Sequence, residues 1–250
     1  MAIPITSEDG LMVRQTGRVV IRIVLDFLVL GVALLCVVLA ENFAMARFFG
    51  MTPNDVRFGG LPGIWISRFL EPLVALPILT LWLWGNGDTW HNLGLRKPKS
   101  WRRFSTHVIV TLLGCGALLY VFMHAVIYPF HFRTASPPYI GNVPTLLAGL
   151  SYYLLGTGLF QELSMRGFLQ NRIAKAFGAG LKALHGAIAT TGVAFGSLHL
   201  SLGPANAVMA GLAGVFLGEM YIWADGNLWV VVVAHSLLNA ALLISWYLNT

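Results

Sequence analysis

The chain has 250 residues, of which 57% are hydrophobic and 10% are charged, and its formal net charge is +6. Its mean hydropathy is +0.73, whereas a soluble domain carries about 25% charged residues. This composition excludes an ordinary soluble domain and predicts an integral membrane protein in a lipid bilayer. The positive charge does not indicate a nucleic-acid partner, because the basic residues lie in loops beside apolar runs, where they set the orientation of the spans.

Apolar runs of suitable length predict seven membrane-spanning helices, separated by turns that contain glycine and proline. The runs cover 19–41, 64–84, 106–128, 145–173, 182–200, 204–223 and 226–247. The predicted fold is therefore an all-α membrane protein, a polytopic bundle of about seven transmembrane helices (or eight, with one further span), forming one domain over 1–250. The first run is longer than the apolar part of a signal peptide, so we expect it to be retained.

Basic residues are unequally divided between the two sides of the predicted bundle. Twelve lie on the side of the N-terminus and four on the other side. Because cytoplasmic loops carry the excess of Lys and Arg, we expect the N-terminus in the cytoplasm and, for seven spans, the C-terminus outside. A single compact set of spans would suit the inner membrane of a bacterium.

A few polar residues inside the apolar runs have less specific interpretations. Asp26 follows Arg22 by four positions, and we interpret this pair as an anchor at the membrane interface. Glu71 and Glu219 lie in apolar runs without an evident partner, and either could belong to a polar cavity or a substrate gate.

Small residues in the sixth run suggest close helix packing. Ala210, Gly214 and Gly218 recur at four-residue spacing, which places small side chains along one face of a helix. Cys36 and Cys115 lie inside apolar runs with neither a disulfide framework nor a metal-binding spacing, and we interpret them as small hydrophobic residues.

The second half of the chain combines an acid, an arginine, two histidines and an amide within apolar runs, where charge is costly and usually functional. Gln161 and His199 are each 19 positions from Gly180, so an antiparallel hairpin places them level, about 28 Å from its turn. A carboxylate can activate water as a general base, and His and Asn donors can stabilise the oxyanion that forms. These residue types therefore predict a hydrolytic site.

The same residues resemble the motifs EExxxR, FxxxH and HxxxN/D of the CAAX-protease and bacteriocin-processing (CPBP, formerly abortive-infection) family. The matching positions are, in chain order, Gln161, Glu162 and Arg166, then Phe195 and His199, then His235 and Asn239. The segment Leu93-Gly94-Leu95-Arg96 is similar to a softer signature of bacterial members. The core of the resemblance falls within 145–247.

The resemblance implies an intramembrane endopeptidase that acts on a membrane-associated protein or peptide. The first Glu of EExxxR is the family's candidate for activating water, and the position of His199 is its partner. The positions of His235 and Asn239 are assigned to the oxyanion hole, Arg166 would hold the acid, and Phe195 would contact substrate. No cofactor is certain; the resemblance leaves a divalent metal open, and the chain lacks an HExxH pattern.

One position departs from the family pattern, because Gln161 stands where the family has its catalytic Glu. Glutamine is nearly isosteric with glutamate but cannot accept a proton as a carboxylate can, so we expect this chain to be nearly inactive. An engineered Glu-to-Gln exchange explains why every other motif position is intact, and we favour it. Alternatively, a natural Gln161 would make the chain a pseudoenzyme or one that uses Glu162.

A function of another class is also compatible with the sequence. A non-catalytic protein of the same fold could act as a membrane scaffold, an immunity factor or a partner-binding protein. The residue that the natural gene encodes at position 161 distinguishes these functions, because a glutamate there supports the enzyme. A transporter is disfavoured, since no inverted repeat or pair of broken helices is evident.

Overall fold

The computed structural model describes residues 7–50, 70–131, 143–178 and 180–248, and within these ranges the regular elements are helices. The α-helices are α1 (Ser7–Phe49), α4 (Leu70–Gly85), α5 (Trp101–Phe122), α6 (Val143–Ser151), α7 (Gly158–Glu162), α8 (Asn171–Ala176), α9 (Leu181–Ser197), α10 (Pro204–Trp223) and α11 (Leu228–Leu248). Shorter segments have other helical windings: the π-helices η1 (Met123–Ile127), η2 (Tyr152–Thr157) and η3 (Leu163–Gln170), and the 3₁₀ turn η4 (Leu200–Leu202).

Each of the seven predicted runs coincides with a helix where the structure describes it. Five helical stretches are long and apolar enough to cross a membrane: Gly17–Phe48, Trp101–Ile127, Val143–Ala176, Pro204–Trp223 and Leu228–Leu248. Helix α4 is a shorter apolar helix of 16 residues, and positions 64–69 of its predicted run lie outside the described residues. The all-helical membrane fold is thus confirmed, while the count of seven spans stays a prediction.

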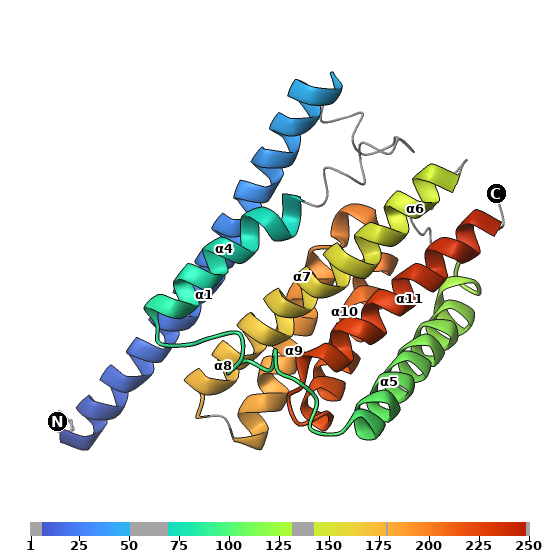
Figure 1. The fold of residues 1–250 in the computed structure, drawn as a ribbon. Helices are drawn as coiled ribbons and strands as arrows, with labels where there is room; N and C mark the ends of the chain where they lie inside the picture. Colours follow the sequence, from blue (N-terminus) through green and yellow to red (C-terminus); the bar gives the residue numbers. More distant parts are fainter. Residues whose placement is uncertain (1–6, 51–69, 132–142, 179, 249–250) are drawn as a thin grey trace.

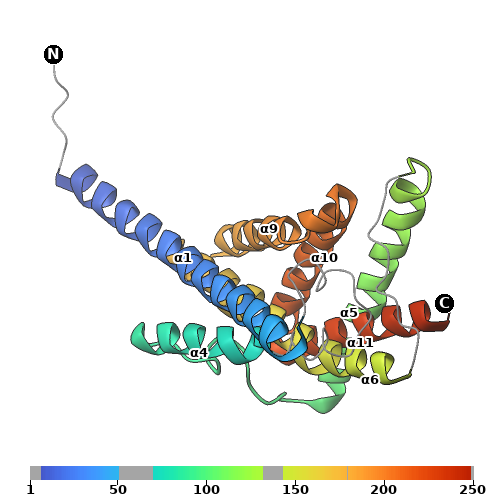
Figure 2. The same cartoon turned by 90° about the horizontal axis from the view of Figure 1, so that it is seen from above.

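The long stretch Val143–Ala176 occupies the middle of the structure (Figure 1). Helices α1 and α4 lie side by side on one flank of it, and α11 packs against its other flank with α5 beyond (Figure 1). Helices α9 and α10 pack tightly against each other, and both lie on one side of the central stretch (Figure 2). Every element that carries a predicted site residue therefore borders the central stretch.

Glycines allow α9 and α10 to approach closely. A Cβ on Gly196 would lie 2.6 Å from the carbonyl oxygen of Ala207, and one on Gly214 would lie 3.3 Å from the ring of Phe195. Gly218 leaves room for Ile188 in the same way. The small-residue stripe predicted in the sixth run thus serves helix packing, and it also fixes the position of Phe195.

A buried ionic network joins α1, the turn after α4, and α8. The guanidinium of Arg172 donates to Asp26 at 3.1 Å and to Asp88 at 2.9 Å, and Lys175 contacts Asp88 at 2.6 Å. Asp26, only 1% exposed, also accepts from the indole of Trp82 at 2.7 Å. The predicted association of Asp26 with Arg22 is therefore wrong, because two residues distant in sequence supply its partners and its carboxylate is buried. Its place at the membrane interface stays a prediction.

Glu71 and Glu219, which have no evident partner in the sequence, each have a partner in the structure. The hydroxyl of Tyr152 lies 3.0 and 2.9 Å from the two carboxylate oxygens of Glu71, which connects α4 to η2. Glu219 contacts Nδ1 of His185 at 2.8 Å, and both side chains are exposed. Neither acid contacts a residue of the predicted site in these interactions.

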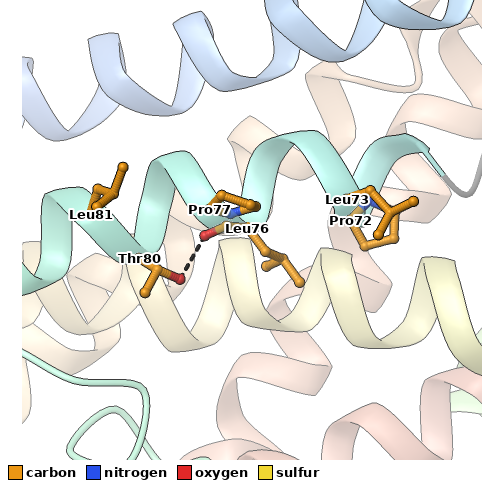
Figure 3. Close-up of a pocket in the computed structure, with 6 residues that line it drawn as sticks. All are labelled: Pro72, Leu73, Leu76, Pro77, Thr80 and Leu81. Carbon is orange, nitrogen blue, oxygen red and sulfur yellow. Dashed lines mark hydrogen bonds between the residues drawn. The ribbon is translucent and has the colours of Figure 1, made fainter.

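A shallow apolar groove of about 540 Å³ runs along α4 (Figure 3). Its lining comes from that helix alone: Pro72, Leu73, Leu76, Pro77, Thr80 and Leu81. Pro77 has no N–H to donate within the helix, while the hydroxyl of Thr80 donates to the carbonyl of Leu76 at 2.6 Å (Figure 3). None of the predicted site residues lines this groove.

The close approach of α9 and α10 predicts a position-specific response to a single methyl group. We expect Gly196→Ala to lower stability by about 1–3 kcal/mol, because the new Cβ overpacks the helix contact. Gly186→Ala, on the same helix with nothing within 4 Å of its Cβ, should be neutral or stabilise by up to about 1 kcal/mol. Thermal unfolding in detergent measures both, and equal losses would contradict this account.

The ionic network predicts an acid-sensitive contribution to stability. Burial raises the pKa of Asp88, but Lys175 and Arg172 together lower it by more than burial raises it. The pKa of Asp88 therefore lies below the ordinary value. The contribution is therefore complete above about pH 4, the unfolded value, and is lost as the pH falls through the folded pKa. Asp88→Asn should remove this component of the pH dependence of thermal unfolding. Asp225→Asn, a control outside the network, should leave it unchanged.

Candidate active site

The central helical stretch changes its winding where the predicted site begins. Helix α7 ends at Glu162 and is followed by the eight residues of η3, which wind as a π-helix. Such segments are rare and frequently mark functional sites. The amide of Asn171 donates to the backbone carbonyls of Arg166 and Gly167 at 2.8 and 3.1 Å, so that a side chain stabilises the unusual winding beside the site.

The centre of the site is a fully buried carboxylate with two cationic or protonatable partners. One oxygen of Glu162, Oε1, accepts from Arg166 at 2.9 Å and contacts Nδ1 of His235 at 2.6 Å. Arg166 donates its other terminal nitrogen to the carbonyl of Gly214 at 2.8 Å. A buried charge is tolerable only when it is paired and hydrogen-bonded. Groups from α7, η3, α10 and α11 meet that condition at Oε1 of Glu162, while Oε2 of Glu162 and Nε of Arg166 have no hydrogen-bond partner in the described structure.

Phe195 connects the acid cluster to both histidines. The guanidinium carbon of Arg166 lies 5.3 Å from the centre of its ring, within the range of a cation–π contact. The ring centres of His199 and His235 lie 4.8 and 6.3 Å from it. Phe195 therefore spaces the two imidazoles, and its buried position makes a role in holding the site at least as direct as the predicted contact with substrate.

A glycine brings the acid and His235 together. A Cβ on Gly158 would collide with the hydroxyl of Ser236, the residue after His235. Since Gly158 lies one helical turn before Glu162, its lack of a side chain lets α7 and α11 approach at the level of the site. The contact between Glu162 and His235 depends on this approach.

The remaining predicted residues form no hydrogen bond to the cluster in the described structure. Gln161, His199 and Asn239 are half-buried, and in the described structure no hydrogen bond joins Gln161 to His199. His199 instead places Nδ1 2.9 Å from the carbonyl of Phe195. The level pairing predicted for Gln161 and His199 stays a prediction. It assumed regular α-helix on both sides of the turn, whereas η3 winds as a π-helix.

The softer signature at residues 93–96 has a structural role in holding the turn between α10 and α11. The carbonyl of Gly94 accepts from the amide of Leu228 at 2.9 Å, and Arg96 donates to the carbonyl of Asp225 at 2.6 Å. Gly94 has φ +104°, and a Cβ there would collide with the carbonyl of Gly226. The segment thus fixes the start of α11, the helix that carries His235 and Asn239.

A second connection reaches the site from the same loop. The hydroxyl of Tyr221 donates to the carbonyl of Leu93 and accepts from the amide of Asn171, both at 2.8 Å. Sequence reasoning missed Asn171, Tyr221 and the carbonyl of Gly214. Asn171 was visible only as a polar residue near the end of an apolar run, and a backbone acceptor leaves no signal in a sequence.

The described residues contain no group of three or more His, Cys, Asp or Glu side chains placed to hold a metal ion. One oxygen of the Glu162 carboxylate, Oε1, is engaged by Arg166 and His235.

Comparison with known proteins gives one match, over the segment that contains the site. Residues 142–241 match the family model of the type II CAAX prenyl endopeptidase Rce1-like proteins. This segment is similar to that family, a family of CAAX-type proteases. The resemblance that the three motifs indicated is thus confirmed. No curated protein and no solved structure matches the chain.

The buried ion pair predicts unequal effects of removing one partner or both. Arg166→Met leaves the carboxylate of Glu162 buried beside an apolar side chain and should cost about 3–5 kcal/mol. The double variant Glu162→Gln, Arg166→Met should be less destabilised than Arg166→Met alone, because no buried charge remains. Thermal unfolding of the two single variants and the double variant measures the difference.

An exposed contact supplies the control for this cycle. Glu219→Gln removes the contact with His185 at the surface and should change stability by at most about 1 kcal/mol. If the loss of stability in Glu162→Gln, Arg166→Met equals the sum of the losses in its two single variants, then Glu162 and Arg166 act independently, contrary to the structure.

Proposed function

We propose that this chain is an intramembrane endopeptidase of the CAAX-protease type, which hydrolyses a peptide bond in a membrane-associated protein or peptide. The observation that supports this function is the buried cluster of Glu162, Arg166 and His235, with Phe195 and His199 beside it. The cluster lies within the segment that matches the family. A scaffold would not require an acid, an arginine and two imidazoles at one buried place.

In the proposed mechanism, a glutamate at position 161 is the general base of the fast reaction, the one that the Gln161→Glu variant would catalyse. A glutamate there would take a proton from water as the oxygen attacks the carbonyl carbon of the scissile bond. His199 would be its partner, and donors at Asn239 and at His235 in its imidazolium form would stabilise the oxyanion. Glu162 and Arg166 would hold His235 in place. Gln161 cannot act as this base, so we propose that the chain turns over substrate far more slowly than its Gln161→Glu variant.

The proposed location is the inner membrane of a bacterium, with the N-terminus in the cytoplasm. The unequal distribution of basic residues supports this orientation. Of the four basic residues assigned to the outer side, Arg57, Arg68 and Arg133 lie outside the described residues, and Arg47 lies at the last turn of α1.

A non-catalytic role in binding a membrane partner is the second candidate. One observation favours it, namely that Gln161 occupies the position of the base while the rest of the cluster is assembled. Such a protein would keep the fold and the pocket chemistry for recognition alone.

Substitution at position 161 tests the proposal directly. We expect Gln161→Glu to raise the rate of cleavage by about 10²–10⁴-fold, the usual contribution of a general base. Gln161→Ala removes the amide without adding a base and should not raise the rate. The purified proteins are compared on a fluorescent farnesylated CAAX-type peptide in liposomes, and on a bacterial membrane fraction in which new protein N-termini are counted. A well-folded Gln161→Glu variant that cleaves neither probe would favour the non-catalytic role.

A further inference from the structure

The contact between Glu162 and His235 determines which nitrogen of the imidazole carries its proton. An ionised carboxylate only accepts hydrogen bonds, and Glu162 forms an ion pair with Arg166 at 2.9 Å. Nδ1 of His235, 2.6 Å from Oε1, must therefore donate its proton to the carboxylate. In the neutral ring, Nε2 then has a free lone pair and no hydrogen.

This tautomer restricts what a neutral His235 can do. A donor to an oxyanion needs a hydrogen, so Nε2 could serve in that way only on a charged imidazolium. As an acceptor, by contrast, the neutral ring is ready to take a proton from water. A carboxylate that orients an imidazole and stabilises the imidazolium is the arrangement that makes histidine a general base in hydrolases.

Burial separates the roles of the two groups. The side chain of Glu162 has no exposed surface, whereas that of His235 keeps 10%, so that the imidazole can contact a bound molecule and the carboxylate cannot. His199 is held by the neutral carbonyl of Phe195, which stabilises a positive ring less than a carboxylate does. Of the two imidazoles, His235 is therefore the better placed to accept a proton.

Two amides lie near the cluster along the chain: Gln161 adjoins Glu162, and Asn239 follows His235 by one turn of α11. Gln161 and Asn239 are half-buried, and in the described structure neither side-chain amide is occupied by a hydrogen bond. Each NH₂ group provides two donors, and amide donors are suited to a developing oxyanion. The replacement of a glutamate by glutamine at position 161 therefore removes a base and adds an oxyanion donor.

Resting on the proposed function, we infer that His235, oriented by Glu162, is the general base of residual peptide-bond hydrolysis in this chain, with the amides of Gln161 and Asn239 holding the oxyanion. Nε2 takes a proton from water while the water oxygen bonds to the carbonyl carbon. When the tetrahedral intermediate collapses, the C–N bond breaks and the imidazolium returns the proton to the leaving nitrogen. One water is consumed, and one carboxyl and one amino terminus are formed.

The first test is the pH dependence of residual cleavage, which needs no substitution. The rate of the unmodified chain on the farnesylated peptide should rise with pH and then level off, as general-base catalysis requires. The charged and titratable groups around His235 are Glu162 from α7, Arg166 from η3, His199 after α9 and, near the first two, Cys115 of α5. His235→Gln should abolish this dependence. A dependence that persists in His235→Gln would assign the base to His199 and overturn the inference.

Variants supply the second test. In the Gln161 chain, His235→Gln should lower kcat by about 10²-fold or more with little change in KM. Glu162→Gln, which acts through His235, should also lower kcat, and the double variant should be no slower than His235→Gln alone. The matched controls are His185→Asn and Glu219→Gln, since these residues form a similar imidazole–carboxylate contact away from the site; both should retain the parent rate.

The outcomes separate this inference from the proposed function. No cleavage by the Gln161 chain, together with cleavage by Gln161→Glu, would overturn the inference and leave the proposed function standing. Cleavage by neither protein would overturn both. A residual rate that falls with rising pH, or that survives His235→Gln, would assign His235 to oxyanion binding or to packing instead.

Discussion

The buried carboxylate of Glu162 is the constraint around which the site is organised. An unpaired charge at that depth would cost several kcal/mol, so the structure has to bring partners to it from several helices. Arg166 comes from the next turn of the same stretch and His235 from α11. The carbonyl of Gly214 then holds Arg166 from α10. The geometry of the site therefore depends on how closely the helices pack, and glycines at 158, 196 and 214 allow that close approach.

The parts of the fold that depend on average composition could be predicted from the sequence. Apolar runs of sufficient length located each helix, since burial in lipid and helical hydrogen bonding together dictate that outcome. The contact of Glu162 with Arg166 followed from their four-residue spacing. The family followed from three short motifs, because their order and spacing together are far more specific than any one alone.

The parts that depend on how helices pack could not be predicted. Asp26 has a neighbour of opposite charge four residues away, yet its partner is Arg172, which is 146 positions distant. The π-helical winding of η3 has no signature in residue type, and it changes which side chains face the neighbouring helix. The pairing of Glu162 with His235 likewise arises from the close approach at Gly158, which a count of residues from a turn cannot reveal.

The ionic network around Arg172 has a consequence for how such chains diverge. Arg172 belongs to the segment that matches the family, while Asp26 and Asp88 lie outside it. The N-terminal helices are thus bound to the family segment through charges that neither part can neutralise alone. A related chain that replaces the arginine with an apolar residue would leave the buried Asp26 without a cation and Asp88 with Lys175 alone, so these positions should vary together across relatives. Such coordinated variation would be detectable in an alignment even where the helices themselves have no recognisable sequence similarity.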